Sequence, residues 1–252
     1  MEVLVGPSRE YGPPPFPVVV LHGGPGAAGS AAGLARGLSR FVSVLEPMQR
    51  ADSIAGQIAE LHAMLETRAQ RPVVLIGWSW GAMLAWMFAA TRPADVSKVI
   101  LVSSAAFDEE SAAQIMPTRL GRLEKREREE IAHLTEPLTT ESLARLTELL
   151  DKADDYAPIS EPNERIELDA HIYDRVWSEA VRLRRSGELA AMGNRITCPV
   201  IAIHGEHDPH PIDGVARLPN VRVITLPRCG HTPWRERFAR DQFFQALQSE
   251  LE

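Results

Sequence analysis

The first hundred residues alternate short apolar runs with longer alanine-rich or amphipathic stretches. The apolar runs are too short for helices, and they predict strands at 18–21, 42–45, 73–76 and 99–102. The stretches between them have the composition or the apolar spacing of helices, which we expect at 27–38, 54–65 and 82–90. The alternation resumes near the end of the chain, with strands expected at 200–203 and 221–226 and a helix at 237–251. Strands that alternate with helices predict an α/β fold, with a mostly parallel central sheet and helices on both of its faces.

The segment at 106–194 breaks this alternation, because it contains no strand-like apolar run. Its charged and amphipathic stretches predict helices instead, at 119–130, 143–150 and 171–183. We therefore divide the chain into a core domain, 1–105 with 195–252, and a helical cap inserted into it, 106–194. We expect the cap to lie over the edge of the sheet at which the strands end.

Composition and charge narrow the partners that this chain can have. With 252 residues, 44% of them hydrophobic, it can bury a core of normal size without a disulfide or a metal. Its net charge of −7 and the lack of a long basic run argue against nucleic acid or an anionic membrane as the main partner. We find no apolar window long enough to span a membrane and no signal-peptide features in residues 1–17. We therefore expect a cytoplasmic protein. Cys198 and Cys229 lie far apart and form no metal-spaced cluster, and a reduced pair is a simpler interpretation than the alternative, one disulfide between them.

The strongest chemical signal is Gly77-Trp78-Ser79-Trp80-Gly81, which lies between a predicted strand and a predicted helix. Glycine is needed on both sides of the serine, because a sharp strand-to-helix turn brings neighbouring backbone close and strains the central residue. Such a turn lifts the Ser79 hydroxyl clear of the sheet and points the amide of Trp80 towards the position of an oxyanion. Ser79 is therefore the candidate nucleophile, and Trp78 is expected to pack in the core or to line the substrate pocket.

A glycine-rich turn, His22-Gly23-Gly24-Pro25-Gly26, follows the first predicted core strand. An oxyanion hole needs a second backbone donor, and a flexible glycine turn lets an amide face the site. We expect Gly24 to supply this donor, with Gly23 as the next candidate. His22 is expected to stabilise its own loop by a hydrogen bond rather than to take part in the chemistry.

Two further polar residues follow the last two predicted strands. Asp208 comes after the strand at 200–203, and His231 comes after the strand at 221–226. Because parallel strands end at one edge of a sheet, Ser79, Asp208 and His231 can converge there as nucleophile, orienting acid and general base.

Other residues near Asp208 compete with it for the role of the acid. The alternatives are Glu206, Asp213 and Asp108. We expect His207 and His210 to be polar loop residues, because a zinc site would need more ligands than this cluster offers. No metal and no cofactor is needed for the chemistry that these residues predict.

Across nearly its whole length the chain resembles the α/β-hydrolase superfamily, and two motifs are similar to those of the proline iminopeptidase group. These are His-Gly-Gly-Pro-Gly at 22–26 and Gly-Trp-Ser-Trp-Gly-Ala at 77–82. The resemblance implies an α/β-hydrolase fold in which a helical cap shapes the substrate pocket. It also implies roles for five residues: Ser79 as nucleophile, Asp208 as acid, His231 as base, and the amides of Trp80 and Gly24 as the oxyanion hole.

The chain departs from the pattern of that group in two places. After the second core strand the group usually carries an Asp-x-Arg-Gly-x-Gly-x-Ser loop, whereas 46–53 here lacks both glycines. In the cap, carboxylates within a pattern like Glu-Asn-His-Tyr hold the amino group of the substrate, and the nearest match here is Asp-Ala-His-Ile-Tyr at 169–173. Asp169, with Glu161 and Glu164, is therefore the candidate amine anchor.

Together these features predict a serine hydrolase that cleaves a small ester or amide through an acyl-enzyme on Ser79. Its substrate would be a small molecule or a short peptide, and an aminopeptidase that releases N-terminal proline is one form of it. The alternatives are a carboxylesterase, thioesterase or lactonase that acts on a small acyl substrate, or a pocket that binds a small molecule with little turnover.

Overall fold

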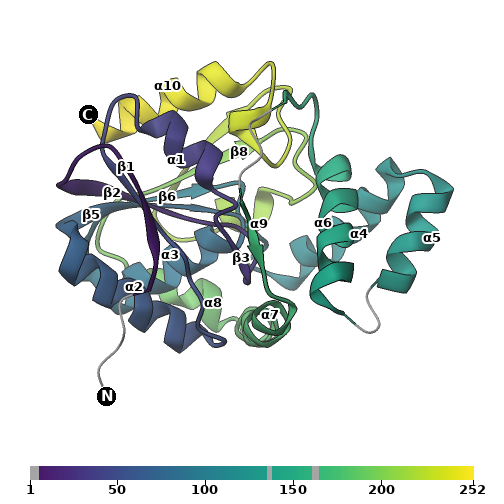
Figure 1. Ribbon diagram of the computed structural model, residues 1–252, viewed down its shortest axis with the longest axis horizontal. Helices are drawn as coiled ribbons and strands as arrows, with labels where there is room; N and C mark the ends of the chain where they lie inside the picture. The colour runs from purple at the N-terminus through teal and green to yellow at the C-terminus, as the bar shows by residue number, and fades with distance from the viewer. Residues whose placement is uncertain (1–5, 135–137, 161–164) are drawn as a thin grey trace.

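The computed structural model describes residues 6–134, 138–160 and 165–252, and the described part is built around a seven-stranded sheet (Figure 1). Its strands follow the order β1-β4-β2-β5-β6-β8-β9. β1 is antiparallel to β4, and every other neighbouring pair in this sheet is parallel. The strands are β1 Ser8–Tyr11, β2 Phe16–Leu21, β4 Val44–Pro47, β5 Ala69–Trp78, β6 Val96–Val102, β8 Val200–Gly205 and β9 Val221–Leu226.

Helices cover both faces of the sheet, which is why its central strands are apolar at almost every position. Successive side chains point to opposite faces: in β2, Val19 and Leu21 belong to one buried cluster, and Val18 and Val20 belong to the other. The helices on the first face are α2 Ile54–Arg68 and α3 Trp80–Thr91, and those on the second are α1 Ala32–Leu38 and α10 Arg240–Leu251. This arrangement confirms the predicted α/β fold.

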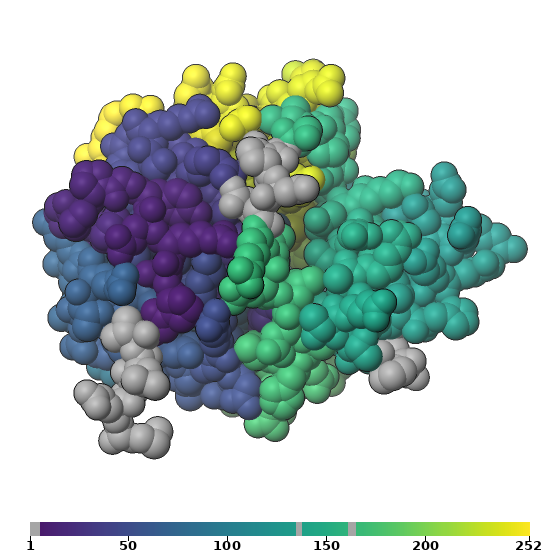
Figure 2. All heavy atoms as spheres, viewed as in Figure 1, coloured from purple at the N-terminus to yellow at the C-terminus, as the bar shows by residue number. Residues whose placement is uncertain are grey.

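A helical insertion, residues 103–199, separates β6 from β8. It contains α4 Glu109–Arg122, α5 Lys125–Leu134, α6 Thr140–Asp154, α7 Ala170–Arg185 and α8 Glu188–Ala191. The helices α4, α5 and α6 share a small apolar core of their own, and they stand out from the side of the molecule in the space-filling view (Figure 2). By contrast, α7 contributes Val176 and Ala180 to the main core. Within the described ranges, no helix combines the length and the apolar character that crossing a membrane requires.

Glycines shorten the first helix relative to the prediction from sequence. The helix expected at 27–38 begins at Ala32, because Gly26 and Gly29 have φ of +76° and +89°, values that do not fit a helix. Ala27–Ala28 instead forms β3, which pairs with β7, Glu167–Leu168, in the helical insertion. A strand of two residues leaves no apolar run in the sequence, so the patterning of 106–194 could not indicate β7.

The charged stretch at 119–130 forms parts of two helices rather than one. Leu123 is extended, with ψ of 153°, and its side chain is buried in the small core of the insertion, so α4 ends before it and α5 starts after it. The spacing of the charged residues in the sequence does not indicate that the helix is interrupted at Leu123. The remaining short elements are α9 Asp213–Ala216 and the 3-10 turns Pro93–Asp95, Met192–Arg195 and Pro233–Arg235.

Trp86 in α3 provides a test of the core. Its side chain is fully buried, its indole N–H donates to Leu189 O at 2.8 Å, and its ring packs edge-on against Phe107 at 5.3 Å. We expect Trp86→Ala to lower the free energy of unfolding by about 3–5 kcal/mol, because it leaves a large cavity. Urea unfolding measures this loss, and Trp86→Phe, which keeps most of the ring volume, is the matched control with a smaller loss. A loss below about 1 kcal/mol for Trp86→Ala would contradict this account of the packing.

Candidate active site

Ser79 lies in a strained turn between β5 and α3. Its backbone has φ of +54° and ψ of −114°, a conformation that residues with a side chain rarely adopt. The turn is so tight that a Cβ on Gly77 would lie 2.0 Å from Gly81 O, and a Cβ on Gly81 would lie 2.4 Å from Leu21 O. Both glycines are therefore required by the backbone, as the motif predicts. Strain of this kind persists only where the surrounding structure enforces it, and it is common at active sites.

Trp80 is the first residue of α3, so its backbone N–H has no acceptor within the helix. The positive end of the helix dipole adds to the pull of this amide on a negative charge. Its indole is buried and donates from Nε1 to Gln57 Oε1 of α2 at 3.2 Å, which fixes the position of the side chain. The ring also lies edge-on to Trp177 of α7, at 6.3 Å between centroids.

The glycine-rich loop after β2 lies against the same turn. Gly23 is so close to the Trp78 ring that a Cβ would come within 2.5 Å of it, and Gly24 has φ of +48°. His22 is fully buried and contacts Gly23 O through Nδ1 at 2.9 Å, which confirms its expected role in its own loop. Burial lowers the pKa of His22 to about 4, so its ring is neutral and Nδ1–H donates to this carbonyl.

Asp208 and His231, 23 residues apart in sequence, form a buried hydrogen-bonded pair. Nδ1 of His231 lies 2.9 Å from Asp208 Oδ2 and 3.0 Å from Oδ1. The ionised carboxylate accepts from Nδ1–H, so Nε2 carries no proton when the imidazole is neutral. That is the tautomer which a general base needs.

The electrostatics of this pair follow from its burial and its mutual attraction. Burial alone would lower the pKa of His231, but the Asp208 charge and its hydrogen bond raise the pKa above the ordinary value. Burial alone would raise the pKa of Asp208, but His231, His204 and His210 hold it well below the ordinary value. Asp208 is therefore an ionised carboxylate inside the protein.

None of the three alternative acids takes the place of Asp208. Asp108 caps α4, where it accepts from the backbone N–H of Ser111 at 2.7 Å, and Glu206 and Asp213 are exposed. The carboxylate that reaches His231 is that of Asp208.

Ser79 and His231 are linked through Trp78 rather than directly. The indole Nε1 of Trp78 donates to His231 O at 2.9 Å, and the two rings are 5.5 Å apart. In the described part of the chain no hydrogen bond joins the Ser79 hydroxyl to the imidazole. Such bonds are often long in unliganded active sites and tighten when substrate binds.

Glu236 holds the loop that carries His231, and sequence reasoning missed it. This fully buried carboxylate accepts from three backbone N–H groups, those of Tyr156, Ala157 and Gly230, at 2.6, 2.7 and 2.9 Å. It thereby ties the His231 loop to the segment of the helical insertion that follows α6. Its partners are backbone groups, which leave no mark in a sequence, so no motif could have identified it.

A second missed contact joins His231 to the helical insertion. The backbone N–H of His231 donates to Asp154 O, at 3.0 Å, at the end of α6. The Asp154 carboxylate is buried and accepts two hydrogen bonds from the Arg119 guanidinium of α4, at 2.7 and 2.5 Å. Planar two-point contacts of this kind fix orientation as well as charge.

His210 lies in the loop after β8, as expected, but it contacts the Asp208–His231 pair. It is buried, its Nδ1 lies 2.9 Å from Asp208 Oδ1, and its ring stacks on that of His231 at 4.2 Å. The Nδ1 atoms of both histidines carry the protons that they donate to Asp208, so neither of these nitrogens is free to bind a metal. His207 lies in the same loop after β8, and its ring stacks on that of Tyr156 at 4.3 Å between centroids.

Asp169, the candidate amine anchor, lies at the start of α7. Its carboxylate caps α7 by accepting from Ile172 N at 3.0 Å, and the residue is exposed. Its backbone N–H donates to Gly26 O at 2.8 Å, which places the start of α7 beside the glycine-rich loop. Glu161 and Glu164, the other candidates, lie outside the described residues.

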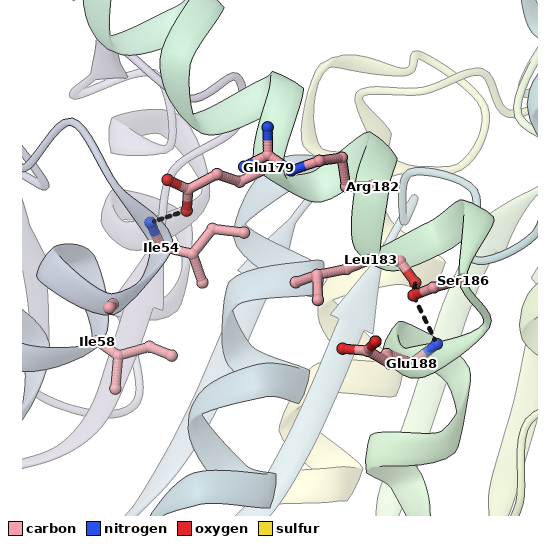
Figure 3. A pocket seen from close by; sticks show the side chains of 8 residues that line it. Ile54, Ile58, Glu179, Arg182, Leu183, Ser186 and Glu188 are labelled. Carbon is pink, nitrogen blue, oxygen red and sulfur yellow. Dashed lines mark hydrogen bonds between the residues drawn. The ribbon is translucent and has the colours of Figure 1, made fainter.

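A groove of about 500 Å³ lies between α2 and α7 (Figure 3). It is lined by Ile54, Ala55, Ile58, Glu179, Arg182, Leu183, Ser186 and Glu188. The carboxylate of Glu179 accepts from Ile54 N at 2.9 Å, so a side chain of α7 caps the start of α2. Ser79 and His231 do not line this groove, so we assign it no catalytic role.

The fold, the strained turn at Ser79 and the buried Asp208–His231 pair define an α/β hydrolase. A sequence model of the alpha/beta hydrolase family matches residues 18–246, and the chain belongs to this family. Human monoacylglycerol lipase ABHD6 is 27% identical over 199 residues, which are 73% of this chain and 57% of that protein. The chain thus spans less than two thirds of the length of this relative.

Solved structures share the fold over almost the whole chain. VinJ matches with a TM-score of 0.70 and 19% identity, over 97% of this chain and 93% of its own. The proline iminopeptidase of Mycobacterium smegmatis matches with a TM-score of 0.61 and 17% identity, over the same shares of the two chains. At these identities the likeness concerns the fold. The resemblance to the proline iminopeptidase group, which the sequence motifs indicate, is therefore supported as a similarity of fold.

The Glu236 carboxylate allows a direct test of how the His231 loop is held. Glu236→Gln replaces one acceptor oxygen by an NH₂ group that faces a backbone N–H, so at least one buried donor loses its partner. We expect the free energy of unfolding to fall by about 1–3 kcal/mol in urea unfolding. Glu206→Gln makes the same change at an exposed position and is the matched control. Equal stabilities of the two variants would overturn the structural role of Glu236.

Proposed function

We propose that this protein is a serine hydrolase that cleaves a small ester, thioester or lactone through an acyl-enzyme on Ser79. The observation that carries the proposal is the buried hydrogen bond between Asp208 and His231, in a protein whose Ser79 occupies a strained strand-to-helix turn. Family membership and the lipase relative support hydrolysis as the type of reaction.

In the proposed reaction His231 Nε2 takes the proton of the Ser79 hydroxyl as its oxygen attacks the carbonyl carbon of the substrate. Asp208 stabilises the imidazolium that forms. The amides of Trp80 and Gly24 hold the oxyanion of the tetrahedral intermediate, each contributing roughly 3–4 kcal/mol in comparable sites. The intermediate collapses with transfer of the proton from His231 to the leaving oxygen or sulfur. Water then attacks the acyl-enzyme by the same steps, and the acid product leaves.

The charges near the site favour an ester over a peptide with a free amino terminus. An aminopeptidase needs a carboxylate that faces the amine of its substrate. Within the described ranges, the carboxylates near the site have other partners. Asp169 caps α7, Asp154 is paired with Arg119, and Glu236 accepts from three backbone amides. Asp151 and Asp155 face the guanidinium of Arg235. We also propose that the helical insertion, 103–199, acts as a cap that sets the size of the acyl group, because Arg119 and Asp154 bring it to His231.

The first prediction from this proposal concerns Ser79. We expect p-nitrophenyl butyrate to be cleaved by the wild type, and Ser79→Ala to lower kcat by on the order of 10⁴-fold or more, because no nucleophile is left. Release of p-nitrophenol measures both rates, and unfolding curves check that the variant is folded. Prolyl-p-nitroanilide is the comparison substrate. Its rapid Ser79-dependent cleavage would replace the ester proposal by aminopeptidase activity, and an unchanged rate in Ser79→Ala would sink the acyl-enzyme.

The second prediction concerns pH. His231 acts as a base only when it is neutral, and its pKa is raised above 6.5, chiefly by Asp208 against the opposing effect of burial. We therefore expect kcat/KM to be highest above this pKa and to fall as the pH drops through it, while Asp208 stays ionised. The pH profile of kcat/KM, which reports the free enzyme, measures this value. An apparent pKa below 6.5 would contradict the proposed environment of His231.

A further inference from the structure

Three histidines surround the single carboxylate of Asp208. His231 and His210 reach it through their Nδ1 atoms at 2.9 Å, and His204 Nε2 lies 3.5 Å from Oδ2. The backbone N–H of His210 also donates to Asp208 Oδ1, at 2.9 Å. An Asp–His pair that acts alone would need only the contact with His231, so the two donors that His210 supplies require an explanation.

We propose that His210 is a positioning residue for the Asp208–His231 pair: its Nδ1–H shares the carboxylate with His231, and its ring supports the imidazole from the side. The proposal rests on the proposed role of His231 as general base. His210 reaches no reacting atom itself in this arrangement, and it acts through Asp208 and through the face of the His231 ring.

The position of His210 is fixed by its neighbours. Its carbonyl accepts from His204 Nε2 at 2.6 Å, and both its backbone N–H and its Nδ1–H are bound to one oxygen of Asp208. Its ring is parallel to that of His231 to within 22°, at 4.2 Å between centroids. His231 therefore has Asp208 at its Nδ1 edge and a flat, rigidly held ring against one face, which limits rotation of the imidazole about its side-chain bonds.

Because His210 is neutral, its ring can stack on His231 without opposing the proton uptake that catalysis needs. Burial, with the neighbouring His231, lowers the pKa of His210 to about 4, so it stays neutral when His231 takes up a proton. A neutral ring against an imidazolium avoids the repulsion that two charged histidines would suffer. Its Nδ1–H also draws on the negative charge of Asp208, because a hydrogen bond to a charged group stabilises that charge. Without this donor more of the Asp208 charge acts on His231.

Other charged or titratable groups also face His231 and stay constant in the test. The charged ones are Asp208, Asp154 of α6 and Arg119 of α4, and the titratable ones are Asp151 of α6 and His204 of β8.

The test compares two substitutions in the same loop. His210→Phe keeps a flat ring on His231 but removes the donor to Asp208, and His207→Phe makes the same change on a ring that stacks on Tyr156. The pKa of His231 is measured by NMR titration of labelled imidazole groups, which needs no turnover. We expect His210→Phe to raise the pKa of His231 by on the order of half a pH unit or more, and His207→Phe to leave it unchanged. An unchanged or lowered His231 pKa in His210→Phe would falsify the proposal.

A measurement on the wild-type protein keeps the proposal testable if His210→Phe does not fold. Nitrogen chemical shifts report which ring nitrogen is protonated. We expect His210 to carry its proton on Nδ1 and to remain neutral throughout the titration of His231. A proton on Nε2, or a His210 that becomes charged together with His231, would overturn it. Because neither readout depends on hydrolysis, this result is separate from the loss of activity in Ser79→Ala that tests the proposed function.

Discussion

A negative charge inside the protein places the strongest constraint on this structure. Asp208 is buried and ionised, and an ionised carboxylate is costly to bury unless it is paired and hydrogen-bonded throughout. The surrounding structure provides donors on both of its oxygens, from the side chain of His231 and from the side chain and backbone of His210. The ends of β8 and β9 must therefore keep their relative positions, because a shift of either loop would leave the charge without a partner. The folding of this edge of the sheet and the geometry of the site depend on the same interaction.

The Ser79 side of the site is held in a different way. Here the constraint is steric: Gly77 and Gly81 allow backbone contacts that no side chain would permit, and these contacts hold Ser79 in a conformation that it would otherwise avoid. One half of the site is thus fixed by charge and the other by close packing. Trp78 joins the halves, since its indole binds the His231 carbonyl while its ring lies against Gly23.

The sequence predicts those parts of the structure that depend on local backbone rules. Adjacent residues determine the strand at 73–76, the turn at Ser79 and the helix after it. A glycine on each side of the serine is explained by the close backbone contacts of this turn. Asp208 and Glu206 both follow the strand at 200–203, so their position does not separate them, and the choice of Asp208 comes from the resemblance to the α/β-hydrolase superfamily. The stacking of His210 on His231 and the contacts of Glu236 and Arg119 could not be predicted, because each is made with a group far away in sequence or with a backbone amide. The break at Leu123 was missed for a similar reason, as the small core that buries this side chain is assembled from distant helices.

The contact between the end of α6 and the His231 loop limits how the sequence of such a protein can change in evolution. The carbonyl of Asp154 accepts the His231 amide, and it lies so close to Gly230 that a Cβ there would come within 2.3 Å of it. A chimaera that exchanged the whole helical insertion for that of a relative would have to place another main-chain carbonyl at the same point, against the His231 amide and Gly230. Recombination between relatives is thus expected to keep the last turn of α6 and the histidine loop as one inherited unit. Arg122 of α4 also binds the carbonyls of Ala153 and His207, so α5, which lies beyond it, is the helix left freer to diverge.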